Sequence, residues 1–160
     1  MKENILGKLR SRFGNAIESV SEYRGELTIV VAKEKIKEVC LFLRDDVELS
    51  FDSLRDLCGA DYYRADDRYE VVYNLYSLPR NFRLRLKVRV DEDDLHVLSV
   101  TGVWATANWH ERETYDMFGI HFDGHPDLRR MYMPEEFEYY PLRKDFPLMG
   151  IPGSLTLPRK

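Results

Sequence analysis

The sequence has 160 residues, of which 44% are hydrophobic and 32% are charged, and its formal net charge is −4. This length allows one domain with a real core plus an appendage, and the acidic total excludes a general attraction to nucleic acid or an anionic membrane. No apolar run approaches the roughly 20 residues that cross a bilayer, and no charged-then-apolar leader opens the chain. We therefore expect a soluble or peripheral protein on the cytosolic side of a membrane.

The first third of the chain predicts short helices and strands in alternation. Ile5, Leu9 and Phe13 repeat at helical spacing before Gly14, which indicates an N-terminal helix. An apolar stripe with lysines and glutamates opposite it predicts a clearer helix over residues 33–44. The remaining predicted elements are strands at 16–20, 27–31 and 47–51, and a short helix at 53–58 that ends at Gly59.

The strongest β signal is a pair of strands at residues 69–77 and 82–90, joined by a turn at 79–81. Apolar and basic residues alternate without a fault along the second strand, so its basic residues share one face of the predicted sheet. These basic residues are Arg83, Arg85, Lys87 and Arg89.

Residues 95–100 indicate a further strand or extended edge, and residues 103–118 indicate a helix. Because helices and strands are mixed and the hairpin is antiparallel, we predict an α+β fold. It comprises a mixed or antiparallel sheet with helices packed on one face over residues 1–118, followed by an extended proline-rich C-terminal tail over 119–160. One face of the last helix gathers Trp104, Ala107, Asn108, Glu111, Thr114 and Phe118.

The predicted tail contains six of the seven prolines together with many aromatic residues. Proline fixes φ and removes a backbone donor, so the segment must be extended and irregular. A disordered linker would be poor in aromatic residues, whereas this segment carries Phe122, Tyr132, Phe137 and Phe146. Such a segment cannot bury its own apolar surface, so it needs another surface to lie on, either its own domain or a partner.

The alternating series His121, Asp123, His125 and Asp127 has the residue types of metal ligands. A glycine and a proline interrupt it, and a strand would set the four side chains in a nearly straight line, which wraps poorly around a tetrahedral ion. We therefore expect no metal site, but a turn in which Asp123 accepts backbone hydrogen bonds, a glycine takes positive φ, and His125 packs or hydrogen-bonds.

No pattern in the sequence predicts catalysis. Glu111 and Glu113 point to different sides of the helix, while Arg112 and Asp116 are four residues apart and are expected to pair along its surface. Two cysteines cannot hold an iron–sulfur cluster by the usual four thiolates. The sequence contains no phosphate-binding loop, dinucleotide fingerprint or nucleophile elbow, so we expect neither catalytic nor cofactor-binding residues.

The basic strand at 83–89 gives the best case for nucleic acid, because a basic strand face can follow phosphates and nearby tyrosines can stack on bases. The acidic total and the acidic run at 91–94 favour a solvated or neutralised sheet face instead. RNA binding is a remote alternative, and a metal hydrolase that uses His121 and His125 is a more remote one.

The region from residue 107 onward resembles the signature of the 30 kDa subunit family of respiratory complex I, which is the C subunit of bacterial NADH-quinone oxidoreductase. The matching segments read ANWHERETYDMFGI at 107–120, FDGHPDLRR at 122–130 and PLRKDFP at 141–147. Weaker resemblance extends to LRDLCGADY at 54–62 and YEVVYNL at 69–75. The sequence departs from the family at 138–140, where Glu-Tyr-Tyr stands in place of the usual glycine.

The resemblance implies a non-catalytic peripheral-arm subunit of proton-translocating NADH:quinone oxidoreductase at the cytoplasmic face of the inner (cell) membrane. This subunit would hold no cofactor, with FMN and iron–sulfur clusters expected in partner subunits. Its partners would be the large 49 kDa-type D subunit, which helps to form the quinone pocket, and the iron–sulfur subunits of the peripheral arm. Membrane contact is expected only through the complex, and no nucleic acid is expected. A close alternative is the equivalent subunit of a related membrane-bound hydrogenase or other-donor, ion-pumping dehydrogenase.

The tail is expected to lie extended over the large subunit. Apolar side chains would anchor in grooves of the partner and charged side chains would fix the register. The expected apolar anchors are Phe118, Phe122, Leu128 and Phe146. The expected polar contacts are Glu111, Arg112, Asp116, His125, Arg129, Arg130, Arg143, Lys144 and Asp145.

Overall fold

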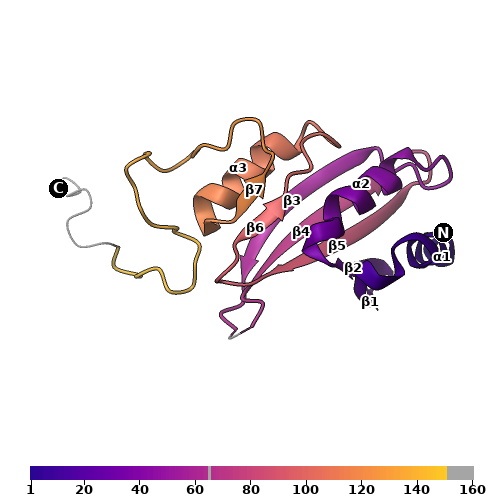
Figure 1. The fold of residues 1–160 in the computed structure, drawn as a ribbon, viewed down its shortest axis with the longest axis horizontal. Coiled ribbons are helices and arrows are strands. Elements are labelled where there is room, and N and C mark those ends of the chain that lie inside the picture. The colour runs from indigo at the N-terminus through magenta and orange to yellow at the C-terminus, as the bar shows by residue number, and fades with distance from the viewer. Residues whose placement is uncertain (65, 151–160) are drawn as a thin grey trace.

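The computed structural model of the protein describes residues 1–64 and 66–150. Its centre is a five-stranded mixed sheet with the strand order β1-β2-β5-β4-β3. Strands β2 and β5 run parallel, and the other neighbours in this sheet run antiparallel (Figure 1). The strands are β1 Ile17–Tyr23, β2 Glu26–Val31, β3 Ser53–Asp61, β4 Tyr69–Ser77 and β5 Phe82–Val90.

The helices pack on one face of this sheet, as predicted from the sequence. Apolar residues of α1, α2 and α3 join the inward residues of the strands in one core cluster. Helix α2 lies across the sheet, while α3 packs against the edge strand β3 (Figure 1). The helices are α1 Lys2–Phe13, α2 Ile36–Asp45 and α3 Ala107–Phe118, with 3₁₀ turns at Gly14–Ala16 and Lys33–Lys35.

Strand β5 and helix α2, which were predicted from a regular repeat of apolar residues, are confirmed. In β5 the apolar positions Leu84, Leu86 and Val88 are buried and the basic positions lie on the opposite face, so the predicted alternation holds. The stripe of α2 is likewise fully buried. Both elements bury one face only. Apolar residues therefore repeat every 2 positions along the strand and about every 3.6 positions along the helix, and this repeat can be recognised in the sequence.

The predicted helix at 53–58 is wrong, because this stretch begins strand β3. A β-bulge shifts the register between Leu54 and Asp56, so two residues of β3 stand where the partner strand has one. As a result Leu54 and Leu57, three residues apart, both face the core. Their spacing imitates one helical turn.

Two other boundaries differ from prediction. The proposed strand at 47–51 is a turn, in which the Asp46 carboxylate accepts hydrogen bonds from the backbone N–H groups of Glu48 and Leu49. The last helix begins at Ala107 and not at residue 103, because a turn precedes it. In that turn the Trp104 indole donates to the carbonyl of Phe51.

A small second sheet joins the start of the predicted tail to the domain. Strand β6, His96–Leu98, pairs in parallel with β7, His121–Asp123. Ile120 and Phe122 are buried in the common core. The division into a domain at 1–118 and a docking tail at 119–160 stays a prediction, and residues 151–160 of that tail lie outside the described part of the chain.

Candidate functional site

Helix α3 contains the signature stretch, and it is covered on two sides. One face lies on β3, where Ala107, Thr114 and Phe118 are buried. Gly59 of β3 permits this close approach, since a Cβ placed there would lie 2.6 Å from Phe118 Cδ2. The opposite face is covered by the chain that returns after β7, and Figure 1 shows this segment passing α3 on the side away from the sheet. The helix therefore joins the domain to the tail.

Glu111 is fully buried on the sheet-facing side of α3. Its carboxylate accepts hydrogen bonds from Ser99 Oγ and from the backbone N–H of Val100, both at 2.7 Å. Burial raises the pKa of Glu111 to about 7, against the opposing effect of these two hydrogen bonds. The expected role of Glu111 in a partner-docking face stays a prediction, although in this conformation the side chain is enclosed by its own domain.

Asp116, on the other face of α3, receives the returning chain and is also fully buried. Arg130 Nη1 donates to its Oδ1 at 3.0 Å. The backbone N–H groups of Met131, Tyr132 and Met133 donate to Oδ2 at 2.9, 2.6 and 3.1 Å. Burial opposes ionisation of this carboxyl, but these backbone donors and the nearby guanidinium hold its pKa below the ordinary value. We call this arrangement the tail clasp.

Arg112 adds a second contact to the tail clasp. Its guanidinium donates to the carbonyls of Arg129 and Arg130 at 3.1 and 3.4 Å, and it lies 4.9 Å from the centre of the Trp109 ring. The predicted surface pair of Arg112 and Asp116 is therefore wrong. Both side chains turn to the returning chain, because that chain offers them unpaired carbonyl and N–H groups that must be satisfied once they are buried.

A second group of bonds fixes the tail near residues 142–145. Arg143 Nε donates to the Phe118 carbonyl at 2.7 Å, which satisfies an orphan carbonyl at the end of α3. The backbone N–H of Lys144 donates to Asp61 Oδ2 at 2.7 Å. Arg68, itself buried, bridges Asp61 and Asp145 at 2.9 and 3.1 Å. Burial opposes ionisation of Asp61, but its bonds to Arg68 and to the tail keep its pKa low.

Gly119 ends α3 in the left-handed region, with φ of 78°. A Cβ there would lie 2.5 Å from Arg143 Nη2 and 2.7 Å from the Tyr140 ring. Gly119→Ala is therefore expected to lower the free energy of unfolding by about 2–3 kcal/mol, from backbone strain and overpacking together. Urea unfolding followed by circular dichroism measures this loss.

The matched control is Gly7→Ala in the interior of α1, where a new Cβ meets no atom within 4 Å. That change is expected to stabilise the protein by up to about 1 kcal/mol, since alanine is the better helix former. Equal effects at the two positions would contradict the special conformation assigned to Gly119.

The residues predicted to bind a partner fall into three groups in the structure. Glu111, Arg112, Asp116, Phe118 and Phe122 are buried within the chain. Phe118 and Phe122 belong to the domain core, so in this conformation they cannot fill partner grooves. Half-buried positions are His125, Leu128, Arg130, Arg143 and Phe146, and exposed positions are Arg129, Lys144 and Asp145.

The predicted partner-binding residues did not include four large apolar side chains that are exposed on α3 and on the tail segment beside it. Trp109 is 60% exposed, Tyr132 58%, Leu142 54% and Tyr139 47%. Trp109 lies on α3, and the other three belong to the segment that the tail clasp and Arg143 hold against it. The signal for Trp109 was present, since it lies off the face shared by Ala107 and Glu111.

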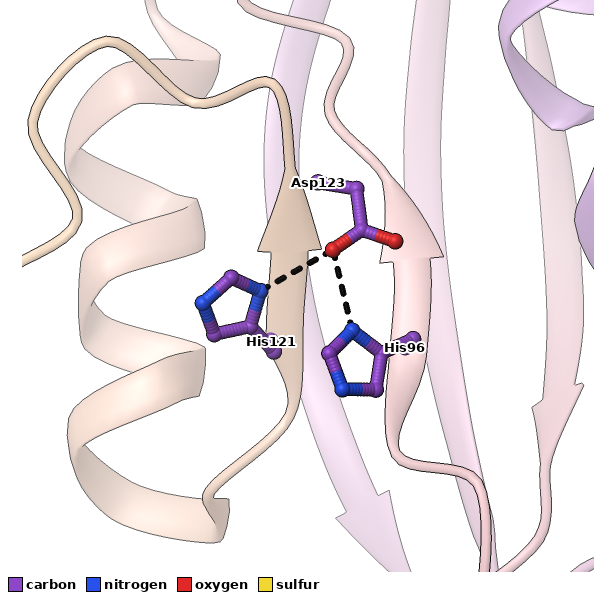
Figure 2. Close-up of side chains that lie close together, drawn as sticks. All are labelled: His96, His121 and Asp123. Carbon is purple, nitrogen blue, oxygen red and sulfur yellow. Dashed lines mark hydrogen bonds and ion pairs between the residues drawn. The ribbon is translucent and has the colours of Figure 1, made fainter.

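The histidine and aspartate series divides into two separate parts. Figure 2 shows His121 and Asp123 of β7 facing His96 of β6, a residue that the sequence did not connect with them. Asp123 Oδ1 lies 2.9 Å from His96 Nδ1 and 3.1 Å from His121 Nδ1. Asp123 thus bonds to two imidazoles, whereas backbone donors were expected.

His125 and Asp127 take no part in that cluster. His125 Nε2 lies 3.1 Å from the Asn108 carbonyl, and its Nδ1 accepts the backbone N–H of Asp127 at 3.0 Å. The predicted hydrogen-bonding role of His125 is therefore confirmed, as is the positive φ of Gly124, at 81°.

The uncovered face of the sheet carries the basic stripe of β5, and acidic neighbours largely neutralise it. Arg85 pairs with Glu26 and Lys87 pairs with Glu70, both at 2.8 Å. Arg89 lies 3.8 Å from Glu18. The neutralising carboxylates belong to strands β1, β2 and β4, and this outcome agrees with the neutralised sheet face that the sequence favoured.

Strands β3 to β7, α3 and the tail clasp lie within the match to a known protein family. The family model described as the 30 kDa subunit of respiratory-chain NADH dehydrogenase matches residues 29–152, which include part of β2 and all of β3 to β7. This chain belongs to that family. The resemblance found from the signature at 107–130 and from residues 141–147 is thereby confirmed.

Relatives across different bacteria support the same assignment. The chain is 52% identical to the NADH-quinone oxidoreductase C subunit numbered 2 of Rhizobium meliloti (strain 1021), over 90% of this chain and 79% of the relative. It is also 52% identical to the NADH-quinone oxidoreductase C subunit of Roseiflexus sp. (strain RS-1), over 90% of this chain and 83% of that protein.

Two solved structures share the fold. The trypsin-resistant fragment (1–134) of Nqo5 is 36% identical, with a TM-score of 0.68 over 79% of this chain and 98% of that chain. A chain of the membrane-bound sulfane sulfur reductase, an archaeal respiratory membrane complex, is 24% identical, with a TM-score of 0.75 over 92% and 86% of the two chains. The second likeness shows the fold alone. Within the described residues, no helix has the length and apolar composition needed to cross a membrane.

Proposed function

We propose that this chain is a non-catalytic peripheral-arm subunit of a proton-translocating NADH:quinone oxidoreductase, and that it docks on the large 49 kDa-type subunit. Family membership and relatives at about half identity support the assignment to this complex. The observation that carries the docking role is the tail, which is held firmly against α3 and still presents large apolar side chains to solvent.

The proposed docking surface consists of Trp109, Tyr132, Tyr139 and Leu142. These side chains are about half or more exposed, and aromatic residues of this kind dominate the energetics of protein interfaces. Their positions are fixed before any partner binds, because Asp116 and Arg143 bond the tail to α3. A preorganised surface loses less conformational entropy on binding than a free segment would.

Exposed charges border this surface. Arg129 and Lys144 lie on the same segment of chain, and both are exposed. Charges at the rim of an interface contribute to association rate and register more than to affinity. This arrangement keeps the expected division between apolar anchors and charged contacts, but it assigns the anchoring role to different residues.

We propose that the chain holds no cofactor, and that FMN, the iron–sulfur clusters and the quinone pocket belong to partner subunits. Its two cysteines cannot supply four cluster thiolates. Cys40 is buried on α2 and Cys58 is exposed on β3, so they do not form a common ligand set. Association with the cytoplasmic face of the membrane would then come through the assembled complex.

The test is an affinity pull-down of the tagged full chain from the membranes of its own organism, read by mass spectrometry. A double variant, Trp109→Ala with Leu142→Asp, is expected to recover the 49 kDa-type and iron–sulfur subunits at least about tenfold less than the wild type. Truncation after residue 118 is unsuitable, because it would remove Ile120 and Phe122 from the core.

Tyr23→Ala serves as the matched control, since Tyr23 is 72% exposed in the β1–β2 hairpin at the far side of the sheet from α3. It is expected to behave as the wild type. Equal recovery by the double variant would reject the docking surface, and absence of the complex from the wild-type eluate would reject the function itself.

The second candidate function is the equivalent subunit of a sister membrane complex with another electron donor, including a membrane-bound hydrogenase. We retain this alternative because a chain of the membrane-bound sulfane sulfur reductase, which is an archaeal respiratory membrane complex, has the same fold. The identities of the co-purified subunits distinguish the two. RNA binding is disfavoured, because neighbouring carboxylates already pair with Arg85 and Lys87.

A further inference from the structure

We propose that His96, His121 and Asp123 form a surface site for a divalent transition-metal ion such as Zn²⁺. Two imidazoles and one carboxylate are a common ligand set for such ions. This proposal goes beyond the docking function and does not depend on it.

The backbone brings the three side chains to one face. In the parallel register of β6 and β7, His96 stands opposite His121, and Asp123 follows two residues after His121. Residues two apart in a strand point to the same side, and Val97 and Phe122 between them point into the core. The core therefore fixes the direction in which the three ligands project.

The observed spacing is close to that of a metal centre. The two Nδ1–Oδ1 distances are 2.9 and 3.1 Å, and one candidate ligand atom from each residue lies within 4.8 Å of the others. Ligands bound at about 2.0–2.1 Å in a tetrahedral site lie roughly 3.3 Å apart. Entry of the ion thus requires the carboxylate to move from the imidazoles by a few tenths of an ångström. The two imidazoles, whose ligand atoms lie within 4.8 Å of each other, must also turn toward the ion, and half-exposed side chains can make such adjustments.

The surroundings favour a cation and leave room for it. Asp123 places a carboxylate oxygen between the two imidazoles, at 2.9 Å from His96 Nδ1 and 3.1 Å from His121 Nδ1. A shallow groove of about 450 Å³ borders the cluster, lined in part by Lys33, Glu34 and Asp94. The ammonium group of Lys33 pairs with Asp94, so it does not occupy the carboxylate of Asp123. Coordination positions beyond the three protein ligands would face solvent and take water.

Metal binding would join β6 to β7 more tightly than hydrogen bonds do. Each of these strands spans three residues, and β7 directly precedes the returning chain of the tail clasp. An ion bound only by the folded state stabilises that state by mass action. The site would therefore secure the attachment of the tail at its first point of contact.

Isothermal titration of the full, untagged chain with zinc chloride tests the proposal. We expect one equivalent of Zn²⁺ to bind, with the affinity reduced about tenfold or more by His96→Ala, His121→Ala or Asp123→Asn. His110→Ala is the matched control, because this histidine lies outside the cluster beside Asp56. It is expected to leave the affinity unchanged.

A thermal melt gives an independent readout and verifies that each variant folds. Zinc at about a hundred times the wild-type dissociation constant should raise the wild-type midpoint by roughly 5–10 °C and should raise the midpoints of the three cluster variants by at most about half as much. Absence of stoichiometric binding would overturn the proposal. Binding that survives the cluster substitutions, or that His110→Ala removes equally, would also overturn it.

Discussion

Asp116→Ala is expected to lower the free energy of unfolding by about 3–5 kcal/mol and to free the tail from α3. The substitution removes a fully buried carboxylate, which accepts hydrogen bonds from Arg130 and from three consecutive backbone N–H groups. The side chain of Arg130 is only 9% exposed, so it would lose its charge partner while still largely enclosed. Leaving such groups unsatisfied costs more than the net gain from an ordinary hydrogen bond.

Two measurements test the expected loss of stability and the release of the tail from α3. Urea unfolding gives the free energy, and limited trypsin digestion reports the tail, which offers cleavage after Arg130, Arg143 and Lys144. The variant should be cut at these bonds at a urea concentration where the wild type is intact. Asp116→Asn, which keeps one oxygen acceptor but loses the charge, should fall between the two.

The control is Asp127→Ala, a carboxylate of the same tail that is 55% exposed and pairs with the exposed Arg129. Surface pairs of this kind contribute about 0–1 kcal/mol, so little change is expected. A loss at Asp116 no larger than that at Asp127 would show that the tail clasp does not hold the tail in solution.

The sequence predicted an element correctly wherever that element buries one face and its apolar residues repeat at a regular spacing. Strand β5 and helix α2 meet this condition, and both were predicted with the correct buried residues. Strand β3 was not, because its bulge sets Leu54 and Leu57 at a spacing of three. A bulge is imposed by pairing with β4, which no local pattern in β3 records.

At the candidate site, the sequence predicted which face of α3 is buried but not the groups to which its charged side chains bond. The helical wheel correctly placed Glu111 with Ala107, Thr114 and Phe118 on one face, and all four are buried. What it could not supply was the partner of each charge, since Glu111 bonds to Ser99 and Asp116 to residues 130–133. Such contacts depend on how loops return over the helix. The charges were therefore assigned to a partner protein although the chain satisfies them itself.

The requirement that the tail lie on another surface was correct, and the structure meets it in part through the chain's own domain. Asp61, Asp116 and the Phe118 carbonyl receive the polar groups of the tail. The apolar side chains Tyr132 and Leu142 stay outside. Polar contacts thus fix the course of the segment, and the apolar surface left over is what a partner would cover.

Glu111 is expected to make the protein less stable as the pH rises from about 4.5 to 7. Its pKa is about 7 in the folded state against 4.5 for an ordinary glutamate, with burial as the main cause. Within this window the unfolded chain releases the proton and the folded chain keeps it, so the unfolded state is favoured progressively. A difference of this size corresponds to about 3 kcal/mol, which is fully present at low pH and lost once the pH exceeds the folded pKa.

Glu111→Gln isolates this effect, because glutamine has the same shape, does not titrate and can still bond to Ser99 and Val100. Other carboxylates act in the opposite direction, since the pKa of Asp61 and of Asp116 is lowered by folding. The useful quantity is therefore the unfolding free energy of the variant minus that of the wild type, measured by urea titration at pH 4 and at pH 8. It should shift by about 3 kcal/mol in favour of the variant as the pH rises.

Glu113→Gln, at an exposed position of the same helix, is the matched control and should give no comparable shift. A difference for Glu111→Gln that stays constant across this range would show that the buried carboxyl titrates as it does in the unfolded chain. Water would then have to reach the space between α3 and the segment at Ser99 and Val100. The complete burial of Glu111, which is 0% exposed, argues against such access.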